Sequence, residues 1–242
     1  MKRLFLIQFL LVALCMSNHA QEFTAFFEEK SLRMDCLFTG DATTQEISLD
    51  KLSSWEGWAG RKHRLGELPL EGNGQVEVSD EATGQIIYRT SFSSLFSEWL
   101  STDEAQTTRR SFEATFLVPY PKQPVKVKVS WLNARHEVMS AMTHRVDPKD
   151  ILIHAMGQRI TPHKYLLKSG NPDRCVDVAI CAEGYTADEM ELFYKDAQVA
   201  CDALFDHEPF KSMKSRFNVV AVASPSLDSG VSVPRLGEWK QT

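Results

Sequence analysis

Apolar and polar residues alternate along much of the chain between residues 21 and 150, which is the pattern of half-buried β-strands. The clearest case is residues 124–132, where three valines and a tryptophan alternate with two lysines and a serine. Residues 111–118 repeat the pattern with larger apolar side chains. Shorter stretches of the same kind are residues 32–38, 75–78 and 85–88. Turn-forming residues separate them, and many short strands at this spacing predict an all-β sandwich over residues 21–154.

The spacing of apolar residues changes to a helical one at residues 92–100 and interrupts the strand pattern. The apolar side chains in question are Phe92, Leu95, Phe96, Trp99 and Leu100. This stretch is either one or two helical turns that close an end of the sandwich, or a strand followed by a turn. The pattern leaves both alternatives open.

A change of character follows residue 150. Residues 150–154 are typical of a short strand, and residues 155–174 contain Pro162, Gly170 and Pro172, which predict a connector between two domains. We therefore expect the domain boundary near residue 155.

Residues 175–242 begin like an α/β domain. An apolar strand from Val176 leads through a turn at Gly184 to a helix, and a second apolar strand follows, which predicts the first strand–helix–strand unit of a parallel sheet. Thr186 and Glu189 are spaced as a capping box at the start of the helix, and Pro209 predicts its end near residue 207. The predicted buried stripe of the helix consists of Met190, Phe193, Tyr194, Ala197, Ala200, Cys201, Leu204 and Phe205. Because only about a dozen residues follow the loop after the second strand, we expect the chain to be the front part of a larger protein.

The first 20 residues are typical of a secretory signal peptide, with Lys2 and Arg3 before an apolar run and small Ala20 at its end. The run is too short to span a bilayer, so we expect a protein that is secreted to the periplasm, the extracellular space or the cell surface. The composition, 43% hydrophobic and 24% charged, is that of a soluble globular protein. The formal net charge is -5, and the chain has no basic stripe with interleaved aromatic residues, which argues against nucleic acid as a partner.

Four cysteines remain after the predicted signal peptide. Cys175 and Cys181 lie about 20 Å apart if the strand between them is fully extended, too far for a disulfide. A bridge from Cys201 to either of them stays open, but buried free thiols are the favoured interpretation for these residues and for Cys36.

Motifs that carry catalysis are absent from the sequence: it has no G-x-S-x-G, no phosphate-binding loop and no dinucleotide fingerprint. The closest approach to a zinc motif begins at His136 and Glu137, but Ser140 occupies the place of the second histidine. We therefore assign no catalytic residue and no metal ligand in this chain.

A possible cleft is predicted at the edge where both apolar strands end. Glu183 and Tyr185 flank the turn glycine after the first strand, and Asp228 and Ser229 lie in the loop after the second. The right-handed crossover rule brings both to the same edge, where open α/β sheets form clefts. The alternative is that Gly184 only forms the turn and Tyr185 only packs.

Several segments, among them VDVAICAEGYTADEMELFYKDA, WAGRKHRLGELPLEGNGQVEV and SFEATFLVPYPK, resemble the secreted bacterial zinc metallopeptidases called IgA peptidases, peptidase family sixty-four. The resemblance covers most of residues 30–240. It implies an N-terminal β-sandwich accessory domain, a zincin-like α/β catalytic domain, and a protein or peptide substrate. It also implies an H-E-x-x-H helix that binds zinc, but no residue of this chain matches that motif. Zinc is therefore expected only in the full-length family member.

Two rival interpretations remain. The first is a non-catalytic cell-surface protein whose sandwich binds a glycan or a protein, with Trp55, Trp58, Trp99 and Trp131 as possible contacts. The alternation in residues 124–132 favours a core position for Trp131. The second is a natural remnant without activity.

Overall fold

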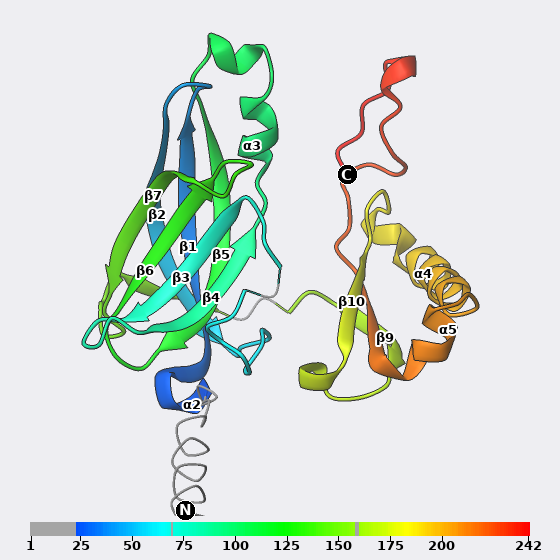
Figure 1. The fold of residues 1–242 in the computed structure, drawn as a ribbon. Coiled ribbons are helices and arrows are strands. Elements are labelled where there is room, and N and C mark those ends of the chain that lie inside the picture. Colours follow the sequence, from blue (N-terminus) through cyan, green and yellow to red (C-terminus); the bar gives the residue numbers. More distant parts are fainter. Residues whose placement is uncertain (1–22, 69, 158–159) are drawn as a thin grey trace, which may run out of the picture. The chain divides into compact units, whose positions relative to one another are not determined.

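The computed structural model describes residues 23–68, 70–157 and 160–242, and the chain divides into two compact units, Met1–Gly157 and Gln158–Thr242 (Figure 1). The predicted signal peptide lies outside the described residues. Within the described ranges, no helix is both long enough and apolar enough to cross a membrane.

The first unit contains two four-stranded sheets that share one apolar core, which is the arrangement of a β-sandwich. Sheet A has the order β5-β1-β2-β8 and sheet B the order β4-β3-β6-β7. All pairings are antiparallel except that of β8 with β2, which is parallel. The strands of sheet A are β1 (Phe27–Gly40), β2 (Gln45–Glu56), β5 (Arg110–Pro121) and β8 (Ile153–Ala155). Those of sheet B are β3 (Gly74–Asp80), β4 (Ile86–Phe92), β6 (Val125–Leu132) and β7 (Val138–Val146).

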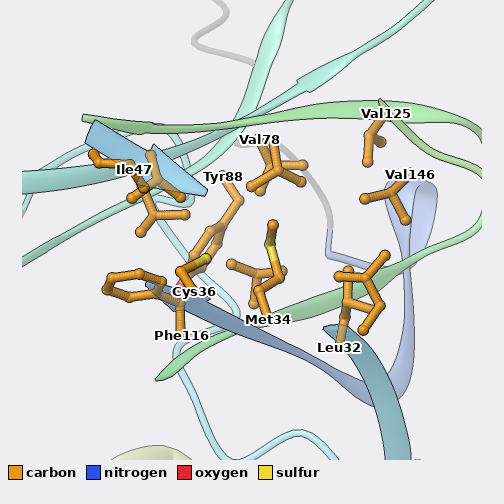
Figure 2. Packing of buried hydrophobic residues seen from close by; sticks show 14 of the residues in the cluster. Leu32, Met34, Cys36, Ile47, Val78, Tyr88, Phe116, Val125 and Val146 are labelled. Atoms are coloured by element: carbon orange, nitrogen blue, oxygen red, sulfur yellow. The ribbon is translucent and has the colours of Figure 1, made fainter. Parts of the chain in front are cut away.

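The core of the sandwich is built from alternate residues of the facing strands. On β1, Leu32, Met34, Cys36 and Phe38 all point inward and are at most 1% exposed. Side chains from both sheets, including Val78 of β3, meet them (Figure 2). Each such side chain contributes about 1.5–3 kcal/mol when it is fully buried. The core is therefore the main source of stability of this unit.

The helical spacing at residues 92–100 belongs to a helix, which decides between the two alternatives. Strand β4 ends at Phe92, and helix α3 (Leu95–Leu100) follows after Ser94, whose hydroxyl accepts a hydrogen bond from the backbone N–H of Phe96. The ring of Phe96 is fully buried and contacts the rings of Phe38, Phe112, Trp99 and Trp131. The helix thus covers the aromatic end of the core.

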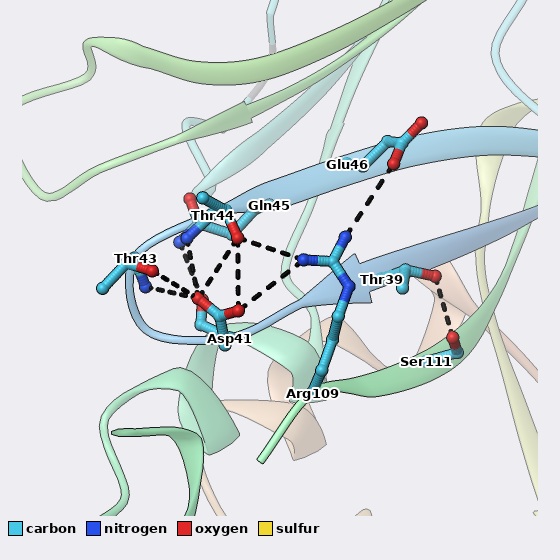
Figure 3. Close-up of polar contacts among 8 residues, drawn as sticks. All are labelled: Thr39, Asp41, Thr43, Thr44, Gln45, Glu46, Arg109 and Ser111. Atoms are coloured by element: carbon cyan, nitrogen blue, oxygen red, sulfur yellow. Dashed lines mark hydrogen bonds and ion pairs between the residues drawn. The ribbon is translucent and has the colours of Figure 1, made fainter. Parts of the chain in front are cut away.

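A network of polar contacts forms the turn between β1 and β2 (Figure 3). The Asp41 carboxylate accepts hydrogen bonds from the backbone N–H groups of Thr43 and Thr44, both at 2.9 Å, and from their hydroxyls. Arg109, which precedes β5, lies 3.6 Å from the same carboxylate and donates to the Thr44 hydroxyl at 3.0 Å. The side-chain hydrogen bond from Thr43 is the largest of several that hold the pKa of Asp41 well below its usual range.

The second unit is a three-stranded sheet with helices. Strands β10 (Val176–Cys181) and β11 (Phe217–Val222) pair in parallel, and β9 (His163–Lys168) pairs antiparallel with β11. The connection from β10 to β11 contains helices α4 (Met190–Leu204) and α5 (Phe210–Met213). Small apolar clusters between α4 and the sheet include Phe193, Ala197 and Cys201.

The prediction of a connector over residues 155–174 is wrong for residues 163–168, which form β9. This strand has only two half-buried apolar residues, Leu166 and Leu167, so its sequence shows no alternation. Its pairing with β11 stabilises it instead. The short strand expected at residues 150–154 is displaced to Ile153–Ala155, after a turn. Strands β2 and β7 were not predicted at all.

The buried stripe of α4 is narrower than predicted. Ala200 is exposed, whereas Phe193, Ala197, Cys201 and Phe205 are buried. Ala200 lies at the margin of the stripe, beyond the reach of the small sheet. The four described cysteines are all free thiols, and Cys181 is exposed rather than buried.

Acid should weaken the β1–β2 turn. Because the folded pKa of Asp41 is lowered, its contribution is fully present above the ordinary aspartate pKa of about 3.9 and is lost as pH falls through the lower folded value. We expect Asp41→Ala to lower the melting temperature at pH 7 and to reduce the difference between the two proteins at pH 2. Thermal melts at both pH values measure this. A melting-temperature difference that does not change with pH would contradict it.

Asn218 should be critical for the second unit, because its buried amide makes four hydrogen bonds. It accepts from the backbone N–H groups of Ser169 and Gly170 at 2.8 and 3.1 Å, and donates to the Gly170 carbonyl at 3.1 Å and to Asp177 at 2.8 Å. We expect Asn218→Ala to destabilise the unit by about 2–4 kcal/mol, since several buried groups lose their partner. Hydrogen exchange of the β11 amides measures this. Lys195→Ala, at an exposed position of α4, is the control and should change stability by less than about 0.5 kcal/mol.

Candidate functional site

The candidate site lies where β10 and β11 end. The two strands are parallel and in register, with Cys181 opposite Val222, so the segments that follow both of them leave the sheet at the same edge. Glu183 to Glu189 follow β10, and residues 224–230 follow β11. This is the edge at which open α/β sheets form ligand clefts.

Three hydrogen bonds join the turn at Gly184 to the loop after β11. The Gly230 N–H donates to the Gly184 carbonyl, the Ser226 N–H donates to the Tyr185 carbonyl, and the Gly184 N–H donates to the Ser226 hydroxyl, each at 2.8 Å. Gly184 has a φ of +78°, which favours glycine, and a Cβ there would lie 2.9 Å from the Gly230 carbonyl oxygen. Glycine is therefore required both for the conformation and for the close approach of the two backbones.

Glu189 extends this link through its side chain. One carboxylate oxygen accepts from the Thr186 N–H at 2.8 Å and from its hydroxyl at 3.0 Å, and the other accepts from the Ser229 hydroxyl at 2.9 Å. The capping box predicted from Thr186 and Glu189 is present. The hydrogen bond from the Thr186 backbone N–H, followed by the one from the Ser229 hydroxyl, lowers the pKa of Glu189. Glu189 thus holds the helix start and the loop together as a carboxylate.

Tyr185 is directed along α4. Its hydroxyl donates to Asp196 at 3.0 Å, and its ring centroid lies 5.5 Å from that of Phe193. The hydrogen bond to Asp196 raises the pKa of Tyr185. The phenol therefore stays protonated at neutral pH and acts here as a hydrogen-bond donor.

Glu183 and Asp228 contact the last residues of the chain. Asp228 accepts from the backbone N–H of Gln241 at 2.8 Å, and the Thr242 hydroxyl lies 3.4 Å from the Glu183 carboxylate. The structure thus brings all four predicted residues to one edge, but each has a separate partner. Sequence reasoning missed Ser226 as a site residue and recognised Glu189 only as a helix cap.

The near-match to a zinc motif does not form a helix. His136 has a φ of 60° in the turn before β7, and its ring nitrogen lies 3.8 Å from Glu71. Over the described ranges, no three histidine, cysteine, aspartate or glutamate side chains are close enough together to hold a metal ion.

The four tryptophans considered as binding contacts do not form one surface. Trp58, Trp99 and Trp131 are at most 9% exposed and belong to the sandwich core. The core position expected for Trp131 from its alternation is confirmed, and Trp99 offers no contact surface to a ligand, whereas Trp58 also lines a cavity. Trp131 is on the inward face of β6, and Trp99 is held by its indole N–H, which donates to Glu104 at 3.0 Å. Only Trp55 is half-exposed.

Comparison with known protein families gives two matches that together cover most of the chain. The model described as Peptidase M64 N-terminus matches residues 22–143, just over half of the sequence. The model described as IgA Peptidase M64 matches residues 165–242. No curated protein matches the chain.

Replacing Gly184 should separate the turn from the loop. Gly184→Ala adds the contact with Gly230 to the cost of a positive φ, and we expect a loss of at least about 2 kcal/mol in the stability of the second unit. Gly237→Ala is the matched control, because Gly237 has a φ of +71° and open space around it. That variant should lose only about 1 kcal/mol. Equal losses in the two variants, measured by hydrogen exchange, would show that the close approach to Gly230 is unimportant.

Proposed function

The chain belongs to the M64 family of peptidases, and on that premise we propose that it is the N-terminal portion of a secreted zinc metallopeptidase that hydrolyses protein substrates. In this proposal the sandwich is an accessory domain. Residues 175–242 supply the first strand–helix–strand unit of a zincin-like catalytic domain.

The family match over residues 165–242 is the observation that carries the proposal. It coincides with the second compact unit, in which parallel β10 and β11 flank α4. Parallel strands joined by a helix are the unit from which larger α/β sheets are built. This unit is therefore suited to be part of a longer sheet.

Zinc does not fit the described residues, because they contain no cluster of three potential ligands. No catalytic step is therefore assigned to this chain. In this proposal the zinc ion is held by a part of the full-length protein other than the described residues. In the family, zinc would activate water for attack on the peptide bond.

The residues at the sheet edge have a positioning role in this proposal. The hydrogen bonds between Gly184, Ser226 and Gly230 hold two loops at the carboxyl ends of the strands. Glu183, Tyr185, Asp228 and Ser229 then belong to one wall of the substrate cleft. Each of them has a hydrogen-bond partner elsewhere in the unit, which makes this wall rigid before substrate binds.

Secretion is supported by the signal-like pattern of residues 1–20. The rival of a glycan-binding or protein-binding sandwich without catalysis loses Trp99 and Trp131 as contacts, because both belong to the core. The peptidase interpretation is therefore the better supported one.

A comparison of zinc content tests the proposal. We expect residues 21–242, purified alone, to contain less than a tenth of a zinc ion per chain, while the product of the complete reading frame contains about one. Elemental analysis measures both. The complete protein should also hydrolyse casein, and a strong chelator should abolish this activity. Two results would contradict the proposal: about one zinc per chain in residues 21–242 that resists mild chelation, or a complete reading frame whose product holds no zinc.

A further inference from the structure

The sandwich has a cavity of about 490 Å³ on the outer face of sheet A. Its lining includes Ser31 of β1, Trp55 of β2 and Leu117 of β5, and residues 56–60 complete it. Ser31 and Trp55 are opposite each other in the β1–β2 pairing. The volume lies in the range of small-ligand sites, about 300–1,000 Å³.

The loop that forms one wall of the cavity is held in place by its own contacts. Ser31 donates its hydroxyl hydrogen to the Gly57 carbonyl at 2.6 Å, and the Trp58 indole N–H donates to the Arg61 carbonyl at 3.2 Å. The Trp58 ring also packs edge-on against Tyr88, with centroids 5.8 Å apart. The cavity is therefore formed before any ligand binds.

Arg61 fixes the rest of this loop. Its guanidinium donates to the carbonyls of Arg64, Leu65 and Glu67 at 2.6, 3.0 and 2.5 Å, and also to the carbonyl of Arg89 on β4. One cation thus ties the segment after the cavity to the sheet on the other side of the core.

The lining favours an uncharged apolar group. The donors of Ser31 and Trp58 already have partners within the protein. Glu56 is the single charged residue of the lining; its side chain is 74% exposed, and its carboxylate lies 3.8 Å from the Lys30 ammonium group. A sugar needs several convergent polar groups and an anion needs a cation, and the lining offers neither. The indoles and the leucine instead provide apolar surface.

The strand beside the cavity indicates which kind of ligand the apolar group belongs to. β5 is an edge strand of sheet A, and among the described residues β1 is its only strand partner (Figure 1). Pro119 and Pro121 have no backbone N–H, so only residues 110–118 of β5 offer an uninterrupted run of main-chain hydrogen-bond donors. An extended peptide can add to this part of the edge and place alternate side chains on one face. Leu117, which is 42% exposed, is on the outer face of β5 and lines the cavity. A side chain on the same face of the added strand would therefore lie next to Leu117 and the cavity.

We propose that this cavity binds an aliphatic or aromatic side chain of an extended segment of the protein substrate, while the segment pairs with the edge of β5. The identification of the partner as a substrate rests on the proposed peptidase function; the binding itself does not. The accessory domain would then bind a part of the substrate other than the cleaved bond.

Peptide binding to residues 21–242, followed by NMR, tests this inference. The probe is a heptapeptide of threonines with lysine at each end and one central phenylalanine, and the same peptide with alanine is the comparison. We expect the phenylalanine peptide to shift the Trp55 indole N–H signal in a saturable way and to bind at least ten-fold more tightly than the alanine peptide. Leu117→Arg and, separately, Trp55→Ala should each weaken binding at least ten-fold.

Val138→Arg is the matched control, because Val138 is an exposed apolar strand residue of sheet B, 55% accessible. It should bind the peptide like the unchanged protein. No saturable shift, equal affinity for both peptides, or full binding by Leu117→Arg would overturn the inference, as would a neutral oligosaccharide that shifts the Trp55 signal when the peptide does not. Zinc and cleavage play no part in these measurements. A failed zinc test with peptide binding intact would thus overturn only the peptidase proposal, and the reverse result only this inference.

Discussion

The alternation of side chains along β1 is the constraint on which the first unit depends. β1 is paired with β2 on one edge and with β5 on the other, so its backbone groups are satisfied within the sheet. Its inward residues, from Leu32 to Phe38, form the middle of the core. A shift of one residue would exchange this row with Arg33 and Asp35 and would bury charge instead. The β1–β2 turn continues from one end of this strand, and the cavity lies beside Ser31 near the other.

Strands with strong alternation could be predicted from the sequence, and those without it could not. Residues 124–132 correspond to β6, and the helical period after Thr186 corresponds to α4. In β2, Ser53 and Ser54 are buried, and in β7, Val138 and Met139 are exposed, so the composition of these strands contradicts their environment. These strands are stabilised by main-chain hydrogen bonds to a neighbouring strand, β1 for β2 and β6 for β7. The family resemblance was confirmed because it rests on long segments rather than on local pattern.

The candidate site was predictable as a place but not as a set of contacts. Parallel strand order decides which loops meet at an edge, and this placed Glu183 and Ser229 together. Which carboxylate reaches Ser229 depends on the path of the turn after Gly184, and that path makes Glu189 the partner. The backbone approach of Gly184 to Gly230 has no counterpart in composition or periodicity, because it joins residues far apart in the chain.

Cys36 lies at the centre of the sandwich, and its burial bears on how the protein would mature if it is secreted as proposed. Burial, assisted by the nearby negative charge of Asp35, raises the pKa of this thiol to about 12. Thiolates, not thiols, carry out disulfide exchange. Once β1 is packed, Cys36 therefore cannot take part in that exchange, whereas in the nascent chain it has the ordinary reactivity of cysteine. Folding of the sandwich would thus compete with disulfide formation by Cys36. The rate of folding would decide whether Cys36 is buried before it forms an unwanted disulfide.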